Sequence, residues 1–169
     1  PSLTLPPPPA TELPTAEAVS ASNTWMNYYG GRQDDTVEAL LLAEDGGFYL
    51  AGSANSQFDT GGSGQAYLLR LDSAGEIFWE LTYADYGGFQ AMRSTGDGGL
   101  LLSGVTSSPE EDNLDIFLLE VDQDGNALWS WTFGGSLDEY GVAWPVEDGG
   151  YFVGGIVVDP NDIVVDDPG

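Results

Sequence analysis

Three reactive residue types are absent from this sequence of 169 residues, namely cysteine, histidine and lysine. Without cysteine the chain has no disulfide, no thiolate nucleophile and no thiolate-bound zinc. Without histidine or lysine it has no Ser-His-Asp triad, no Schiff-base amine and no P-loop. It also has no stretch of about 18 apolar residues that would span a membrane. The chemistry that remains is that of carboxylates, as in glycosidases or oxygen-ligand metal sites.

Positive charge is also scarce, because three arginines face 28 Asp and Glu residues and the formal net charge is -25. Nucleic acids and anionic membrane surfaces are bound through basic patches, so neither is expected as a partner. Self-repulsion of this size destabilises a compact fold unless high salt or weakly bound calcium or magnesium offsets it. The composition predicts a halophilic protein, extracellular or at the cell surface, with no dedicated cofactor. An ordinary acidic secreted domain is the alternative.

Residues 1–23 differ in composition from the rest of the chain. Six prolines occur within the first 14 residues, and four of them are consecutive (Pro6, Pro7, Pro8 and Pro9). Such a segment favours extended polyproline II conformation and has too few apolar groups to fold alone. We expect a Pro-rich extended leader, either a flexible linker or a segment held by its own domain or by a neighbouring subunit.

Residues 24–169 form a second unit, which repeats with a period of about 50 residues. An Asp-Gly-Gly step followed by an apolar run begins at Asp45, Asp97 and Asp148. A longer motif, Leu-Asp-x-x-Gly-x-x-x-Trp at residues 71–79, recurs at residues 121–129 with Val121 in place of the leucine. The approximate repeats are 24–78, 79–128 and 129–169. In each repeat an aromatic residue follows a tryptophan by four positions: Trp25 and Tyr29, Trp79 and Tyr83, Trp129 and Phe133.

The repeats predict an all-β protein without a convincing helix. The Asp-Gly-Gly steps supply the positive φ angles that tight hairpin turns require. The runs Phe48–Gly52 and Tyr151–Gly155 are apolar on both faces, so we expect both to be covered on both sides. Trp79 and Tyr83 share one strand face, whereas Thr82 lies on the other. The predicted strands are 37–43, 48–54, 66–72, 77–84, 88–95, 100–107, 115–122, 127–134, 140–147, 151–158 and a short 162–166.

Four short strands in each repeat, with glycine-rich turns, are typical of a β-propeller blade. The Asp-Gly-Gly strand and the Leu-Asp-x-x-Gly-x-x-x-Trp turn resemble the repeats of secreted bacterial and archaeal β-propeller proteins, which are related to PQQ-like propellers. The resemblance implies about three blade-like repeats in which Trp79 and Trp129 pack between adjacent blades. It implies no quinone site, since a fold relationship does not carry chemistry.

The third repeat lacks a fourth strand, and Trp25–Tyr29 resembles a fourth strand without a blade of its own. We therefore expect this strand of one subunit to complete the third blade of the next, in head-to-tail homopolymers. If Trp25 packs within its own chain, strand exchange is not how these subunits join. The predicted function is a non-enzymatic structural subunit of an extracellular filament or surface assembly. A ligand-binding propeller module, with carbohydrate as its ligand, is the alternative. The expected assembly residues are the three tryptophan–aromatic pairs and Pro6 to Pro9.

Other candidate sites have simpler explanations. The acidic turn 122–126 resembles the start of a calcium loop, but Phe133 stands where an EF-hand needs glutamate, so a hairpin turn is expected. Carboxylates in equivalent loops lie in repeated polar surroundings, which do not raise a pKa as a glycosidase acid requires; they are Asp34, Asp35, Glu38, Asp138 and Glu139. Four aromatic residues fit either packing between blades or stacking on sugars: Tyr28, Tyr86, Tyr140 and Trp144.

Overall fold

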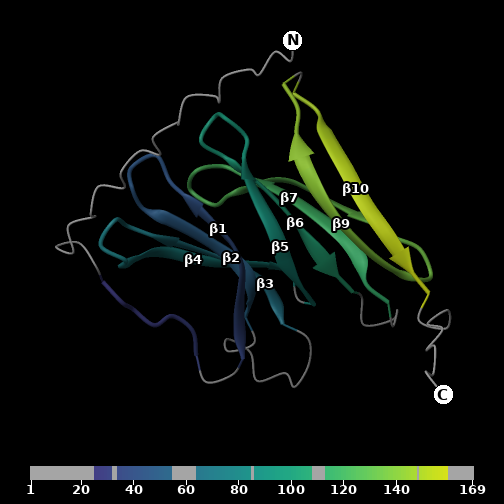
Figure 1. Cartoon of the computed structure of the whole chain (residues 1–169), viewed down its shortest axis with the longest axis horizontal. Helices are drawn as coiled ribbons and strands as arrows, with labels where there is room; N and C mark the ends of the chain where they lie inside the picture. Colours follow the sequence, from purple (N-terminus) through teal and green to yellow (C-terminus); the bar gives the residue numbers. More distant parts are fainter. Residues whose placement is uncertain are drawn as a thin grey trace, which may run out of the picture.

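The computed structural model describes residues 25–31, 34–54, 64–84, 86–107, 113–147 and 149–159. In these residues all regular secondary structure is β-strand, so the all-β class predicted from the sequence is confirmed. No helix in the described residues is long and apolar enough to cross a membrane. Ten strands form antiparallel sheets of four, four and two strands (Figure 1). The described sheets do not close into a barrel or a propeller.

Each sheet follows chain order, and neighbouring strands are antiparallel. The first contains β1 (Asp35–Leu42), β2 (Phe48–Ala54), β3 (Gln65–Leu71) and β4 (Ile77–Ala84). The second contains β5 (Gly87–Ser94), β6 (Leu100–Thr106), β7 (Asp115–Val121) and β8 (Ala127–Phe133). The third contains β9 (Asp138–Pro145) and β10 (Tyr151–Val158). These bounds lie within two residues of the predicted ones. The strand predicted at 162–166 lies outside the described residues, as does the leader 1–23.

The glycine-rich turns explain why the strands begin and end where they do. The first glycine of each Asp-Gly-Gly step has a positive φ: 84° at Gly46, 91° at Gly98 and 80° at Gly149. Gly75 and Gly125, in the turns between third and fourth strands, also have positive φ, at 81° and 84°. Residues with a Cβ rarely adopt this conformation, so the glycines fix the hairpins. The sequence prediction for the Asp-Gly-Gly steps is confirmed.

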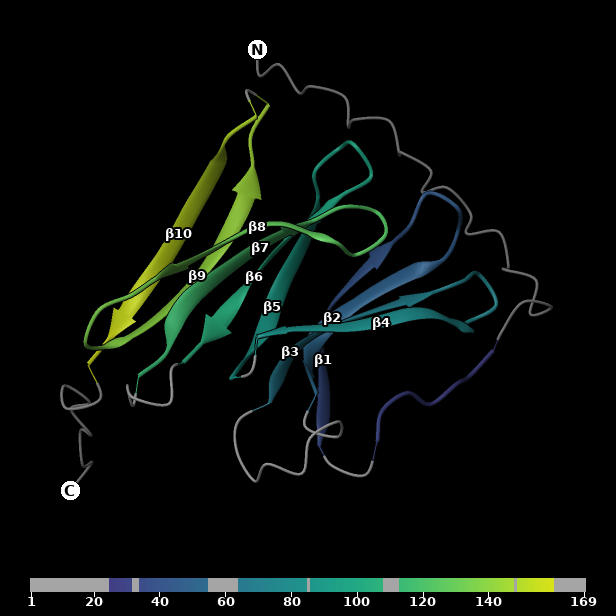
Figure 2. The same ribbon diagram turned by 180° about the vertical axis from the view of Figure 1, so that it is seen from behind.

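The three sheets stack face to face in chain order, as the two opposite views show (Figures 1 and 2). β5 packs over β1, β2 and β3 of the first sheet, and β9 packs over β6 and β7 of the second. Phe89, Met92 and Leu68 are buried together between the first and second sheets. Leu101 and Ala143 are buried together between the second and third sheets. The first strand of the second sheet and the first strand of the third sheet therefore each cover one face of the sheet before.

The expectation that β10 is covered on both sides is wrong for the described structure. Tyr151, Phe152 and Val153 are exposed, whereas the corresponding run in β2 is buried or half-buried. The third sheet rests on the second sheet by one face, and no described element covers its other face. The apolar pattern of β10 predicts that both faces of the strand are covered, but the described residues cover only one of them.

Candidate assembly interface

The tryptophan–aromatic pair of β4 lies where the first sheet meets the second. The Trp79 ring packs 6.0 Å from the Tyr49 ring, measured between centroids. Tyr83 donates its hydroxyl to the Gly125 carbonyl over 2.8 Å. A Cβ added to Gly125 would lie 3.1 Å from the Trp79 ring, so this close approach requires glycine. Burial, followed by the nearby charge of Asp122, raises the pKa of Tyr83.

The segment Trp25–Tyr29 makes equivalent contacts with the first sheet. Tyr29 donates its hydroxyl to the Gly75 carbonyl over 2.5 Å, and the Asn27 amide donates to the same oxygen over 2.9 Å. A Cβ at Gly75 would lie 2.7 Å from the Trp25 ring. Trp25 also packs edge-on against Phe48, with ring centroids 5.8 Å apart. The segment belongs to none of the described sheets.

Trp25 thus packs within its own chain, which is the outcome that we set against strand exchange. The contact of Trp25 and Tyr29 with the Gly75 turn matches one made by β4, because Trp79 and Tyr83 contact the Gly125 turn of the sheet that follows their own. A fourth strand uses its aromatic rings on the following sheet and its backbone edge on its own sheet. Trp25–Tyr29 has the first contact without the second. By the criterion given above, this ring contact contradicts the predicted exchange. The backbone edge of Trp25–Tyr29 pairs with no described strand, and that edge is what the proposal below uses.

In the third pair, the tryptophan connects the second and third sheets. Trp129 donates from Nε1 to Glu120 over 2.7 Å and packs 5.1 Å from the Tyr151 ring. The Tyr151 hydroxyl donates to the same Glu120 oxygen. This hydrogen bond to the carboxylate, followed by desolvation, raises the pKa of Tyr151. Buried Glu120 therefore fastens β10 to β7 and β8.

The rest of the third motif is exposed, in contrast to its counterpart on β4. Trp131 and Phe133 pack edge-on against each other, with centroids 5.6 Å apart, and both are exposed. Their counterparts Leu81 and Tyr83 contact the Gly125 turn. No described turn covers Phe133 in the same way. Pro6 to Pro9, the remaining expected assembly residues, lie outside the described residues.

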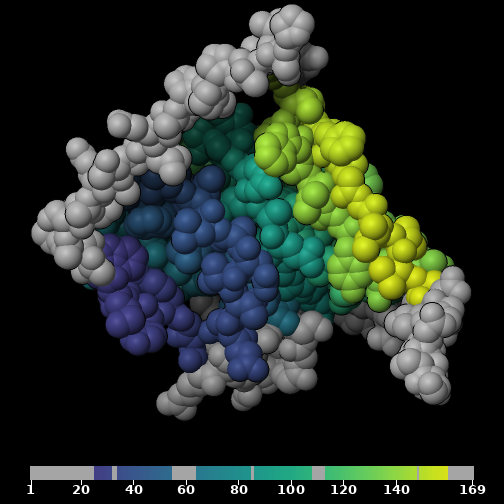
Figure 3. All heavy atoms as spheres, in the orientation of Figure 1, coloured from purple at the N-terminus to yellow at the C-terminus, as the bar shows by residue number. Residues whose placement is uncertain are grey.

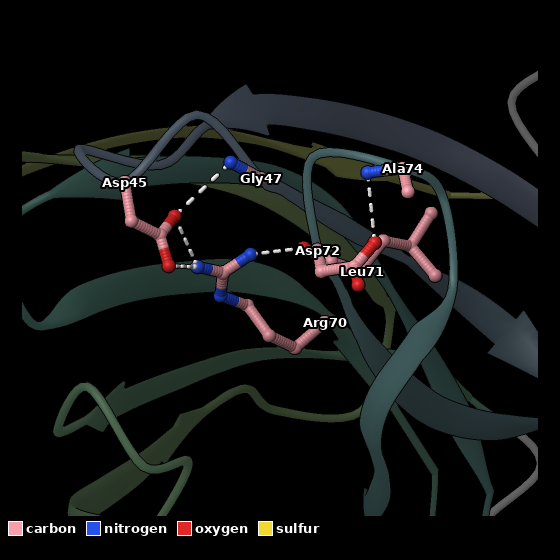
Figure 4. A network of polar contacts seen from close by, with 6 residues as sticks. All are labelled: Asp45, Gly47, Arg70, Leu71, Asp72 and Ala74. Atoms are coloured by element: carbon pink, nitrogen blue, oxygen red, sulfur yellow. Dashed lines mark hydrogen bonds and ion pairs between the residues drawn. The ribbon is translucent and has the colours of Figure 1, made fainter.

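Sequence reasoning missed a pair of buried charged residues at equivalent positions of the repeat, Arg70 and Glu120. Arg70 bonds both oxygens of Asp45 at 2.6 Å and the Leu71 carbonyl (Figure 4), and its guanidinium lies 4.6 Å from the Tyr49 ring centroid. The backbone N–H of Gly47, followed by Arg70, lowers the pKa of Asp45. The sequence carries a signal for them, because each is a charged residue within an apolar run, Leu68–Leu71 in β3 and Ile116–Val121 in β7.

The other candidates lie apart from this interface. Asp122 accepts from the backbone N–H groups of Asp124 and Asn126, at 2.9 and 2.8 Å, as in a hairpin turn. No group of three or more carboxylates among the described residues could hold a metal ion. Trp144 is exposed but lies beneath the guanidinium of Arg93, 4.5 Å from ring centroid to Cζ. Tyr28 and Tyr86 are exposed, and Tyr140 is half-buried.

Comparisons with known proteins add no family to this picture, since neither a protein-family model nor a curated protein matches the sequence. The resemblance to secreted propeller repeats therefore stays a prediction based on the motifs. The site is defined by the geometry alone: two docked tryptophan–aromatic pairs, a third pair that is partly exposed, and a two-stranded sheet with an open face.

Proposed function

We propose that this protein is a non-enzymatic structural subunit of an extracellular filament or surface assembly. Neighbouring copies join head to tail, and Trp25–Tyr29 of one copy serves as the fourth strand of the third sheet of the next. One observation carries the proposal: this segment makes the contacts of a fourth strand with the first sheet, yet belongs to none of the described sheets. The third sheet, with two described strands, is the one that needs such a partner.

The charge supports an extracellular, salt-rich setting for this assembly. Subunits that carry a net charge of -25 repel each other at low ionic strength. Screening over about 8–10 Å at physiological salt, and over about 3 Å in molar salt, allows apolar strands to meet. The proposed subunits therefore assemble in high salt and separate when it is removed.

Deletion of residues 1–31 tests the exchange. The shortened chain should remain monomeric in molar salt under conditions in which the full chain polymerises, as measured by sedimentation velocity. A synthetic peptide of residues 1–31 should bind the shortened chain and cap growth of the full chain. Polymerisation of the shortened chain would contradict strand exchange.

A paired substitution separates exchange from general loss of the segment. Trp25→Ala removes the ring that packs on Phe48 and the Gly75 turn. Tyr28→Ala, at an exposed position of the same segment, is the matched control. We expect Trp25→Ala to raise the critical concentration for assembly at least tenfold and Tyr28→Ala to leave it unchanged.

A carbohydrate-binding propeller module is the second candidate, favoured by the exposed Trp131–Phe133 pair. It predicts monomers or small closed oligomers, and quenching of tryptophan fluorescence by oligosaccharides. The structural role predicts open polymers and no such quenching.

A further inference from the structure

The two junctions between sheets inside the chain have the same arrangement. We call the face that a sheet turns toward the preceding sheet its front, and the face that it turns toward the following sheet its back. Met92 of β5 and Ala143 of β9 point toward the sheet before their own and are buried. They meet Tyr49 of β2 and Leu101 of β6, which point toward the sheet after their own. Each junction thus joins the front of a first strand to the back of a second strand.

The front of β1 carries side chains at positions equivalent to those that are buried on the fronts of β5 and β9. The β-bulge between Val37 and Ala39 recurs in β5 between Phe89 and Ala91, which aligns the two strands. In the hairpin registers, Leu40, Met92 and Ala143 pair with equivalent residues of β2, β6 and β10. Leu40 is 63% exposed, whereas Met92 and Ala143 are 3% and 4% exposed. Val37 is likewise exposed, although Phe89 at its position is fully buried.

The back of β10 carries an apolar side chain at the position that is buried on the backs of β2 and β6. Tyr49, Leu101 and Phe152 are the second residues of these strands. Tyr49 and Leu101 are 7% and 1% exposed beneath the following sheet, whereas Phe152 is 68% exposed. Ile156 and, on the neighbouring strand β9, Val142 are also exposed. Across the face in Figure 3 the sheets run from the blue first sheet to the yellow β10, so the front and the back that no described element covers belong to opposite ends of the stack.

The geometry points to a second copy of this chain as the partner of both faces. The front of β1 in one copy, with Val37 and Leu40, stacks on the back of β9–β10 in the next, with Phe152 and Ile156. This interface would repeat the junctions already present twice inside each chain. It deepens the proposed head-to-tail assembly, on which it rests, and adds a face-to-face contact to the exchanged strand.

The interface joins different surfaces, so it is heterologous and propagates. Two copies that stack in this way would place six sheets in series, a number within the range of closed propellers. The series closes into a ring if the rotation between sheets closes, and grows as a filament if it does not. Both products contain the same front-to-back contact.

Two single substitutions test the contact. Leu40→Asp places a charge on the front, and Phe152→Asp places one on the back; both positions are exposed, so far-UV circular dichroism should stay that of the unmodified chain. Gln123→Asp, at an exposed turn that belongs to neither face, adds the same charge as a control. In molar salt, sedimentation velocity should show monomers for each face variant alone and unaltered assembly for the control.

A mixture of the two face variants gives the sharper result. Leu40→Asp retains its back and Phe152→Asp retains its front, so an equal mixture should form dimers and nothing larger. Dimers or polymers of either variant alone, or no association in the mixture, would overturn the front-to-back contact. If the unmodified chain stays monomeric, the proposed function fails as well. If deletion of residues 1–31 blocks assembly while both face variants polymerise, exchange stands and stacking fails.

Discussion

The first and third sheets differ in burial although their sequences share one pattern. Tyr49 in β2 and Phe152 in β10 are aromatic residues at the same position of the repeat, the second residue after the Asp-Gly-Gly step. Tyr49 lies under the second sheet and is buried, whereas Phe152 faces outward and is exposed. The apolar pattern therefore indicates which sheet faces are suited to burial. Whether such a face is buried depends on whether another sheet packs on it.

The largest effect should come from removing a covered tryptophan. Trp79→Ala, and Trp129→Ala in the same way, should lower the free energy of unfolding by about 2–3 kcal/mol, which is less than the cost of deleting a fully buried aromatic side chain because both rings are half-buried. Thermal or urea unfolding of the monomer in constant salt measures the change.

The uncovered positions provide the contrast. Trp131→Ala, at an exposed position, and Thr82→Ala, on the opposite face of β4, should each cost less than about 1 kcal/mol. If either matched Trp79→Ala in the same unfolding experiment, the assignment of covered and uncovered faces would be wrong.

Salt should have the next largest effect and should reveal which sheet is held less firmly. Transfer from molar salt to dilute buffer should lower the Tm by about ten degrees or more, because the net negative charge is no longer screened. Millimolar calcium or magnesium should restore part of this loss. In hydrogen exchange, the amides of β9–β10 should lose protection before those of β5–β8, since the third sheet has one covered face. Equal stability in dilute buffer and molar salt would contradict this prediction.

Removal of Glu120 should weaken the connection between the second and third sheets. Glu120→Ala leaves the Trp129 indole and the Tyr151 hydroxyl without their acceptor, at a cost of about 1–3 kcal/mol. Glu120→Gln keeps an acceptor oxygen and should cost less. The difference is measured by urea unfolding, with hydrogen exchange in β10 as the local readout. Equal costs for the two substitutions would show that packing, rather than the acceptor, holds β10.

Acid should have the smallest effect, and it should act on the turns of the first two sheets. Hydrogen bonds lower the pKa of Asp45, Asp97 and Asp122, for Asp45 with Arg70 as a second cause. A lowered folded-state pKa stabilises the fold above the unfolded value of about 3.9, and this stabilisation is lost as the pH falls through the folded value. Stability should therefore decline below about pH 4, and Asp122→Asn should reduce that decline in an acid titration followed by circular dichroism. An unchanged titration in this variant would remove Asp122 from the explanation.

Much of the fold could be predicted from the sequence, because its signals are local and repeated. Glycines such as Gly46 and Gly98 need positive φ, and they place the hairpins directly. The strand bounds follow from these turns. The uncovered back of β10 could not be predicted, because its apolar run looks the same whether or not a sheet covers it.

The candidate interface was predictable in part. The spacing of Trp25 and Tyr29 marked the segment as equivalent to β4, but the ring contact with Gly75 depends on how a turn from another part of the chain is placed. The buried Arg70 and Glu120 differ in charge at equivalent positions, and each has its own partners, so the repeat did not reveal their roles.

Cysteine cross-linking tests the central claim most directly, because the chain has no cysteine of its own. Leu40→Cys and Phe152→Cys variants, mixed in molar salt under mild oxidation, should form a disulfide-linked heterodimer rapidly, since the two side chains would face each other across the front-to-back contact. Gln123→Cys mixed with Phe152→Cys is the matched control. We predict cross-linking of the first pair at least tenfold faster than of the control pair. Equal rates for the two mixtures would contradict the stacking of one copy on the next.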